Sequence, residues 1–311
     1  MNKKNIDKKH YSLSVTFSLF ILAMASLAIL VAFNMNSNEE TRTVRDKIRE
    51  VGYGKIETIN PLILESSERV VDKTNVNVDL INEIKRVYNI NVIYGDGTEY
   101  LTKTVSSKPI YNESEVNSML LELINCLEKY PNNIFKEIEL KDYTIEICLV
   151  DHFNNDNIAL ATRDSNNNFK VYISNIEKTE KVKKSIHHEF YHILEYYMKL
   201  EFDINTLYKN WNQFNPKDFK YQENIALLDT TYVYQMDKQG RNYFVSIYSK
   251  SSDKEDRAEV FADTMCAETK PDYYTDNIGA IKGKMNNICE AIKSSFYSVN
   301  YGTSIYWTRF F

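Results

Sequence analysis

The spacing of apolar residues along the chain predicts a fold that combines helices with a few short strands. Apolar positions three and four residues apart mark one face of a helix, whereas alternating or short apolar runs mark strands. Helical spacing is found at residues 78–87, 113–129, 185–200 and 277–296. Strand patterns are found at residues 144–150, 158–162 and 169–173. This order predicts an α+β fold, in which a small mixed sheet precedes a mainly helical C-terminal part.

The N-terminal part contains an uncharged, mainly apolar run at residues 13–33, which is about long enough to span a membrane. Four lysines precede it, at Lys3, Lys4, Lys8 and Lys9. Because a basic flank stays on the cytoplasmic side, we expect a cytoplasmic tail at 1–12, a single transmembrane anchor at 13–33 and an extracellular remainder. The alternative is a cleaved signal peptide, followed by secretion. Cleavage after the A-M-A sequence at 23–25 would leave an apolar N-terminus, so we favour the retained anchor.

A β-hairpin is expected in the segment that follows the anchor. Apolar runs at residues 90–94 and 99–105 flank a G-D-G sequence at 95–97. Aspartate and glycine favour the tight turns that join antiparallel strands. Residues 34–106 are therefore predicted to form a juxtamembrane segment or a small subdomain.

Charge and cysteine content narrow the functional classes. The net charge is −5, and no basic stripe with interleaved aromatic residues is present, so no nucleic-acid partner is expected. Three lysines at residues 181, 183 and 184 are interpreted as the solvated side of a helix. The cysteines form no C-x-x-C pair, so a cysteine-based zinc site is not expected. Disulfides and free thiols both stay open for Cys126, Cys148, Cys266 and Cys289.

The sequence H-E-F-Y-H at residues 188–192 points to a metal site. His188 and His192 are four residues apart, so both project from one face of a helix, and two imidazoles placed in this way can bind one Zn²⁺ ion. Glu189 would lie beside the metal as the general base for the water that zinc activates. A separate apolar stripe on the same helix comprises Ile186, Phe190, Ile193 and Tyr197. The alternative is a solvated helix with incidental histidines.

A third zinc ligand must come from another segment of the chain. The longer pattern H-E-x-x-H-x-x-G-x-x-H fails, because Glu195 and Met198 occupy its last two defined positions. The sequence E-D-R-A-E-V-F-A at 255–262 predicts a second helix, on which Glu255 and Glu259 can both face the first helix. Glu255 is the best candidate ligand, and Glu259 would accept the free N–H of a ligating histidine.

Both glutamates also have an ordinary structural interpretation. Ser252 stands three residues before Glu255, a spacing that fits a capping box in which the glutamate caps its own helix. Glu259 could equally be a solvated helix residue. Local sequence does not choose between these interpretations.

The two motifs in this order resemble the glutamate-zincin (gluzincin) metallopeptidases. More narrowly, residues 107–270 resemble the anthrax lethal factor-like and Pro-Pro endopeptidase-like group and bacterial zinc-binding metallopeptidases. The resemblance implies a zincin-like domain at 107–311, with Glu255 as the third ligand. It also implies that Tyr248, seven residues before that ligand, donates a hydrogen bond to the developing oxyanion. In such enzymes a sheet edge aligns the substrate as an added strand, and residues 169–174 are our candidate edge.

Two local features have no assigned chemical role. Trp211 and the sequence N-P-K-D-F-K-Y at 215–221 resemble the segment between the two motifs in bacterial relatives. Tyr191 departs from the family, because many relatives carry a small residue at this motif position. We expect the packing around Tyr191 to differ accordingly.

The combined expectation is a membrane-anchored extracellular zinc endopeptidase that acts on a peptide or protein substrate with one Zn²⁺ ion per chain. The metal ligands would be His188, His192 and Glu255, supported by Glu259, and the catalytic residues would be Glu189 and Tyr248. Two alternatives stay open: a non-catalytic zincin-fold surface binding module, and a zinc amidase that acts on cell-wall peptide.

Overall fold

The computed structural model describes residues 73–310, except for 140–142, 155–156, 165–167, 176–178, 223–242, 276–278 and 301–304. The predicted cytoplasmic tail, the predicted anchor at 13–33 and residues 34–72 lie outside the described residues. None of the described helices combines the length and the apolar character needed to cross a membrane.

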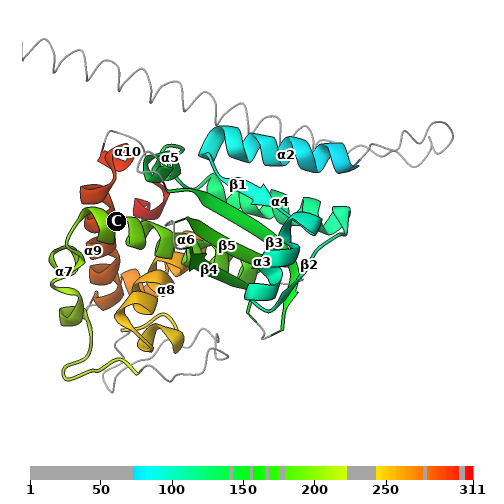
Figure 1. Ribbon diagram of the computed structural model, residues 1–311. Helices are drawn as coiled ribbons and strands as arrows, with labels where there is room; N and C mark the ends of the chain where they lie inside the picture. The colour runs from blue at the N-terminus through cyan, green and yellow to red at the C-terminus, as the bar shows by residue number, and fades with distance from the viewer. Residues whose placement is uncertain are drawn as a thin grey trace, which may run out of the picture. The chain divides into compact units, whose positions relative to one another are not determined.

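A five-stranded sheet lies at the centre of the described part (Figure 1). Its strands are β1 (Asn91–Ile93), β2 (Ser107–Pro109), β3 (Ile145–Phe153), β4 (Ala159–Arg163) and β5 (Phe169–Ser174). The order is β1-β3-β5-β4, with β1 and β5 parallel to β3, and β4 antiparallel to β5. β2 pairs with the second half of β3. The three strands predicted after residue 140 are confirmed, as is the α+β class.

The predicted hairpin at residues 90–105 is wrong. β1 pairs in parallel with β3, and the chain then forms a 3-10 turn, η2 (Gly95–Thr98), and a short helix, α3 (Glu99–Thr104). Gly95 adopts a positive φ of 61°, and the Thr98 hydroxyl donates to its carbonyl oxygen, which closes the turn. Leu101 of α3 packs against the sheet, so tertiary packing selects a helix where the local pattern suggested a strand.

The longer helices are α2 (Lys73–Tyr88), α4 (Glu113–Leu127), α6 (Thr179–Glu201), α8 (Asp253–Cys266) and α9 (Ala280–Ser295). They confirm every helix that the apolar spacing predicts. Asn112 begins α4 by accepting hydrogen bonds from the backbone of Ser114 and Glu115. The shorter elements are α5 (Ile134–Glu139), α7 (Ile204–Leu207), η3 (Trp211–Phe214), η4 (Tyr248–Lys250), η5 (Asp272–Tyr274), α10 (Tyr297–Asn300) and η6 (Tyr306–Thr308).

The packing of the helices places the two sequence motifs, residues 188–192 on α6 and residues 255–262 on α8, side by side. α6 lies against one face of the sheet, where it contacts β4 and β5, and α4 packs beside it. Strand side chains alternate between faces, so the face toward α6 carries Ile147, Leu149, Val171 and Ile173. A cluster on the other face joins Cys148, Val150, Phe153 and Tyr172 to Ile93, Leu101, Val105 and Leu160. α8 packs along α6, and α9 contacts both (Figure 1).

The prediction that residues 169–174 form the sheet edge is wrong. β5 pairs with β3 on one side and with β4 on the other, so it lies inside the sheet. β4 folds back antiparallel on β5 and, among the described strands, pairs with no other. The edge that faces the metal motif is therefore β4.

The open question about the cysteines has an answer in the structure. All four are free thiols; Cys126 and Cys148 are fully buried, and Cys266 and Cys289 are partly buried. Burial raises the pKa of the Cys148 thiol to about 12, so it stays protonated. The thiols therefore serve as packing residues in this fold.

Candidate metal centre

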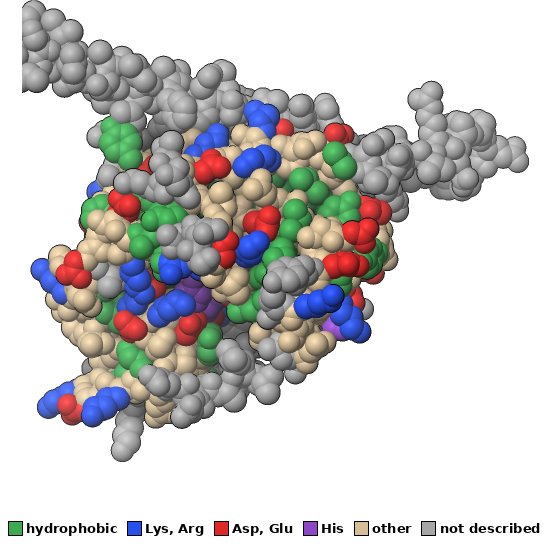
Figure 2. All heavy atoms as spheres, in the orientation of Figure 1, with side chains coloured by type: hydrophobic (Ala, Val, Ile, Leu, Met, Phe, Trp, Pro, Cys, Tyr) green, Lys and Arg blue, Asp and Glu red, His purple; other side chains and the backbone are tan. Residues whose placement is uncertain are grey.

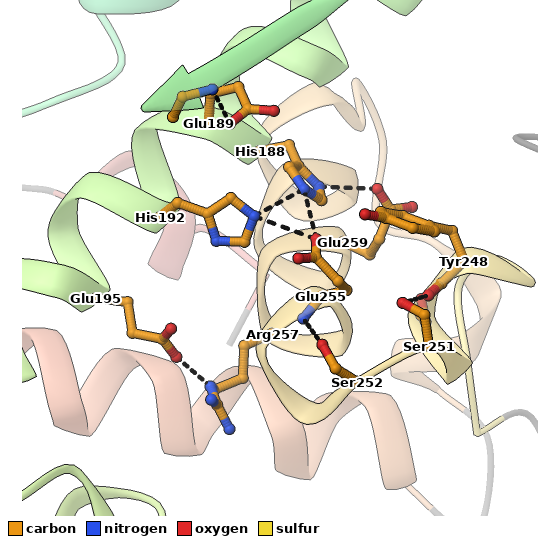
Figure 3. A network of polar contacts seen from close by, with 12 residues as sticks. His188, Glu189, His192, Glu195, Tyr248, Ser251, Ser252, Glu255, Arg257 and Glu259 are labelled. Atoms are coloured by element: carbon orange, nitrogen blue, oxygen red, sulfur yellow. Dashed lines mark hydrogen bonds and ion pairs between the residues drawn. The ribbon is translucent and has the colours of Figure 1, made fainter. Parts of the chain in front are cut away.

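α6 presents two different sides, as its sequence pattern indicates. The predicted apolar stripe of Ile186, Phe190, Ile193 and Tyr197 is buried. His188 and His192 project toward α8 instead (Figure 3). Tyr191 is buried too: its hydroxyl bonds that of Tyr208 at 2.7 Å, and its ring packs 5.1 Å from Phe261 of α8. The bulky side chain of Tyr191 therefore fills the interface between α6 and α8.

Three side-chain atoms from the two helices converge on one point (Figure 3). The Oε2 atom of Glu255 lies 3.0 Å from Nε2 of His188 and 3.2 Å from Nε2 of His192. The two Nε2 atoms lie 3.0 Å apart. In the described part of the chain, His188, His192 and Glu255 thus form a cluster in which each residue offers one ligand atom to a metal ion.

The donor set suits zinc. Two imidazole nitrogens and one carboxylate oxygen are among its common ligands, and ligands at about 2.0–2.1 Å from a tetrahedral ion lie roughly 3.3 Å apart. The observed separations of 3.0–3.2 Å are close to that value. The fourth position of such a site would remain for water or substrate.

Glu255 forms only the backbone half of the capping box that its sequence allowed, and its carboxylate lies among the candidate ligands. Its backbone N–H donates to the hydroxyl of Ser252, the N-cap of α8, so the backbone half of the predicted cap is present. Its carboxylate turns instead toward the two histidines. Burial raises the pKa of Glu255, but hydrogen bonds from His188 and His192 outweigh burial and hold it well below its usual range.

Glu259 lies one turn further along α8 and contacts the other nitrogen of His188. Its Oε1 atom is 2.9 Å from Nδ1 of His188. Its Oε2 atom is 2.9 Å from the ammonium of Lys184, which is 12% exposed. Burial raises the pKa of Glu259, but Lys184 and His188 together hold it well below its usual range. Lys184 is therefore a partner of the site, and its interpretation as a solvated residue is wrong.

Glu189 lies beside the converging atoms and contacts the sheet edge. Its Oε2 atom accepts a 2.8 Å hydrogen bond from the backbone N–H of Ala161, in β4 (Figure 3). The bond fixes this carboxylate between α6 and the edge strand. This is the position that a base needs if the substrate lies along β4.

Tyr248 approaches the site from η4, a turn that contacts α8. Its ring centroid lies 6.0 Å from that of His188. Burial raises the pKa of Tyr248, and the negative charges of Glu255 and Glu189 raise it further. The phenol is therefore protonated at neutral pH and can donate a hydrogen bond.

Two buried ion pairs hold α8 in place, and sequence reasoning missed both. Arg257 donates to Glu195 of α6, and both side chains are almost fully buried. Lys284 of α9 donates to Asp256 over 2.6 Å, and both are fully buried. Asp256 and Arg257 directly follow Glu255, so both pairs act on the start of the helix that carries it.

The Trp211 segment, to which the sequence assigned no role, contacts the Asp256–Lys284 ion pair through Asp256. The hydroxyl of Tyr221 donates to Asp256, and it accepts from the indole of Trp211 and the side-chain amide of Asn215. The only sequence signal for this network was the likeness of the segment to bacterial relatives.

A hollow leads to the candidate site from the surface. Figure 2 shows histidine side chains at its bottom and lysine and arginine side chains gathered beside it. A pocket of about 130 Å³ adjoins His192 and continues between α6 and β4. The arrangement combines three side chains that could hold a metal ion, a helix carboxylate hydrogen-bonded to the edge strand and a protonated phenol, a set that suits metal-assisted hydrolysis.

A helix-borne H-E-x-x-H sequence beside a glutamate from a second helix is an arrangement found in zinc metallopeptidases. A family model described as "Putative zinc-binding metallo-peptidase" matches residues 70–295. Because this match covers most of the chain, the chain belongs to that family. The comparison with curated proteins and the comparison with solved structures found no match. Membership supports zinc-dependent peptidase activity on peptide or protein substrates in general.

Proposed function

We propose that this chain is a zinc endopeptidase of the glutamate-zincin type, anchored in the membrane with its catalytic domain outside the cell. The observation that carries the enzymatic part is the convergence of His188, His192 and Glu255 within 3.0–3.2 Å of one another. The position of Glu189 beside them supports hydrolysis over simple metal storage. The N-terminal apolar run with its lysine flank supports the location.

In the proposed mechanism His188, His192 and Glu255 would hold the zinc ion, and Glu259 orients His188 through its Nδ1 atom. Zinc bound there would polarise the scissile carbonyl and acidify a water molecule. Glu189 takes the proton of the attacking water and delivers it to the leaving amine. Tyr248 donates its phenolic proton in a hydrogen bond to the oxyanion that develops.

β4 offers the substrate a row of backbone groups. In an antiparallel pair, every second residue directs its N–H and C=O away from its partner. The N–H of Ser174 donates to the carbonyl oxygen of Ile158, and the N–H of Asp164 donates to the carbonyl oxygen of Asn168. The even-numbered residues of β4 therefore direct their backbone N–H and C=O groups toward β5. Ala159, Ala161 and Arg163 therefore face outward, and a peptide could add to this edge as a further strand.

The decisive experiment compares zinc content and cleavage of a peptide library for the full chain and three variants. Glu189→Gln should keep zinc and lose cleavage by at least about a hundredfold, because it removes the base. Glu255→Ala should lose zinc as well as cleavage. Glu180→Gln, which changes an exposed glutamate at the start of α6, is the matched control and should behave as wild type.

Full cleavage by Glu189→Gln would contradict the assigned base, and unchanged zinc affinity in Glu255→Ala would contradict the assigned ligand. A zinc-loaded wild type that cleaves no peptide would refute peptidase activity and favour the non-catalytic binding module. Release of fragments from cell-wall peptide alone would favour the amidase.

A further inference from the structure

A pocket beside the proposed catalytic site has a distinctive charge. Its walls come from β4, the middle of α6 and the start of α8, and its volume is about 130 Å³, room for a single short side chain. The residues that matter for its chemistry are Ala161, Arg163, Ile193, Tyr196, Lys199 and Lys254. No step of the proposed mechanism uses it.

Cations dominate the rim of this pocket. The guanidinium of Arg163 stacks 4.1 Å from the centre of the Tyr196 ring, which holds it in place. Lys254, in the first turn of α8, also lines the pocket. Within the described part of the chain, neither Arg163 nor Lys254 forms an ion pair. Their charges are thus available to a ligand.

The one carboxylate in the pocket wall is already neutralised. Glu195 is buried, and its two oxygens accept from Arg257 and from Lys199, the latter at 3.1 Å. It therefore offers little attraction to a cationic ligand and leaves the wall with a positive balance. Ile193 and the face of Tyr196 supply the apolar surface along which the methylene groups of a bound side chain would lie.

The position of the pocket relative to the bond that is cut follows from β4. The backbone N–H of Ala161 donates a hydrogen bond to Glu189, the proposed base, so the scissile bond should lie beside Ala161. Arg163 lies two residues further, about 7 Å along the strand. A substrate strand added antiparallel, the more stable pairing, runs opposite to β4. The substrate residue beside Arg163 then lies on the amino-terminal side of the scissile bond.

We propose that this pocket is a substrate subsite that binds an acidic side chain, aspartate or glutamate, on the amino-terminal side of the scissile bond. The proposal rests on the peptidase function proposed above. Arg163 from β4 and Lys254 from α8 bind the carboxylate, and the apolar wall contacts its methylene groups. Glutamine or asparagine has the same shape but lacks the charge, and lysine meets the same cations with repulsion.

The test measures peptide binding by the zinc-loaded full chain that carries Glu189→Gln, so that bound peptides stay intact. Fluorescence anisotropy gives the Kd of blocked peptides that differ only in Asp against Asn, or Glu against Gln, at single positions. The acidic member should bind about tenfold more tightly, since hydrogen bonds to charged groups are the stronger ones. The ratio should decline as salt is added. In parallel, the wild type is tested for cleavage of the same peptides.

Adding Arg163→Gln and Lys254→Gln together should reduce the acid-to-amide ratio to about one. The matched control removes two exposed lysines outside the pocket, Lys217→Gln and Lys293→Gln, and should keep the ratio. Equal Kd values for acid and amide, no binding of the acidic peptides, or a preference only on the carboxyl-terminal side would overturn the proposal. A preference for acid that the double variant abolishes, in a wild type that cleaves no peptide, would show an acid-binding pocket but refute both the peptidase function and the role of the pocket as a substrate subsite.

Discussion

At the scale of single residues, His188 is where a proton and a metal ion compete. Burial lowers its pKa, but hydrogen bonds to Glu255 and Glu259 outweigh burial and raise the pKa to about 10. The metal-free imidazole therefore carries a proton throughout the neutral range and loses it only as the pH rises through that value. Because a ligating histidine must be neutral, zinc has to displace this proton.

Zinc binding near neutral pH should consequently release about one proton per chain, and affinity should rise about tenfold per pH unit below the pKa of His188. Calorimetric titration of zinc into the metal-free chain, in buffers of different ionisation enthalpy, measures the proton count. Glu259→Gln, which removes one carboxylate partner of His188, should reduce the release. An apparent enthalpy that does not depend on the buffer would contradict the expectation.

At the scale of elements, β4 and the start of α8 determine what the site can do. Among the described strands β4 is the sheet edge that faces α6, and its outward backbone groups alternate with those that hold it to β5. The start of α8 carries Glu255 and is held by the buried pairs of Asp256 and Arg257. Both elements can be tested without changing a metal ligand.

Proline at position 161 should separate substrate binding from folding. The N–H of Ala161 faces the edge and bonds Glu189, so Ala161→Pro leaves the ladder to β5 intact but removes that donor. We expect zinc content and Tm near wild type, with kcat/KM lowered at least about tenfold. Thr162→Pro removes a ladder hydrogen bond and should lower Tm instead. Normal kcat/KM for Ala161→Pro would argue against substrate binding along β4.

Lys284→Met should destabilise the fold by about 3–5 kcal/mol, because it leaves the buried carboxylate of Asp256 without its cation. Burial raises the pKa of Asp256 and lowers that of Lys284, so each charge depends on the other. Denaturant unfolding gives the free energy. Lys293→Met, at an exposed position of the same helix, should change it by less than about 0.5 kcal/mol. An equally small effect at Lys284 would show that the pair is not needed.

At the scale of the whole molecule, residues 13–33 should anchor the catalytic part at the extracellular face of the cell membrane. The full chain, expressed in bacteria, should appear in the membrane fraction and be digested by protease added to intact cells. A chain without residues 1–33 should leave that fraction. Protection from the protease would contradict the proposed orientation. A shortened chain in the medium would favour cleavage and secretion.

The sequence by itself determined the features that depend on neighbouring residues. Helical spacing places His188 and His192 on one face, and i, i+4 spacing allows Glu255 and Glu259 to face them. The structure brings these four side chains together as that reasoning expected. The four longer helices after residue 107 and the three strands after residue 140 were predictable for the same reason, because the spacing of their apolar residues is a local property, whereas the short elements β2, α5, α7 and α10 were not predicted.

Only the tertiary structure decided the features that depend on which distant segments meet. The edge role of β4, the helix in place of a second hairpin strand, and the pairing of Lys184 with Glu259 each join residues far apart in the chain. Asp256 and Lys284 look like surface residues in sequence, because nothing local shows that another helix buries them. Burial and pairing are properties of the packed fold. The spacing of apolar residues within one segment carries no information about which distant segment packs against it.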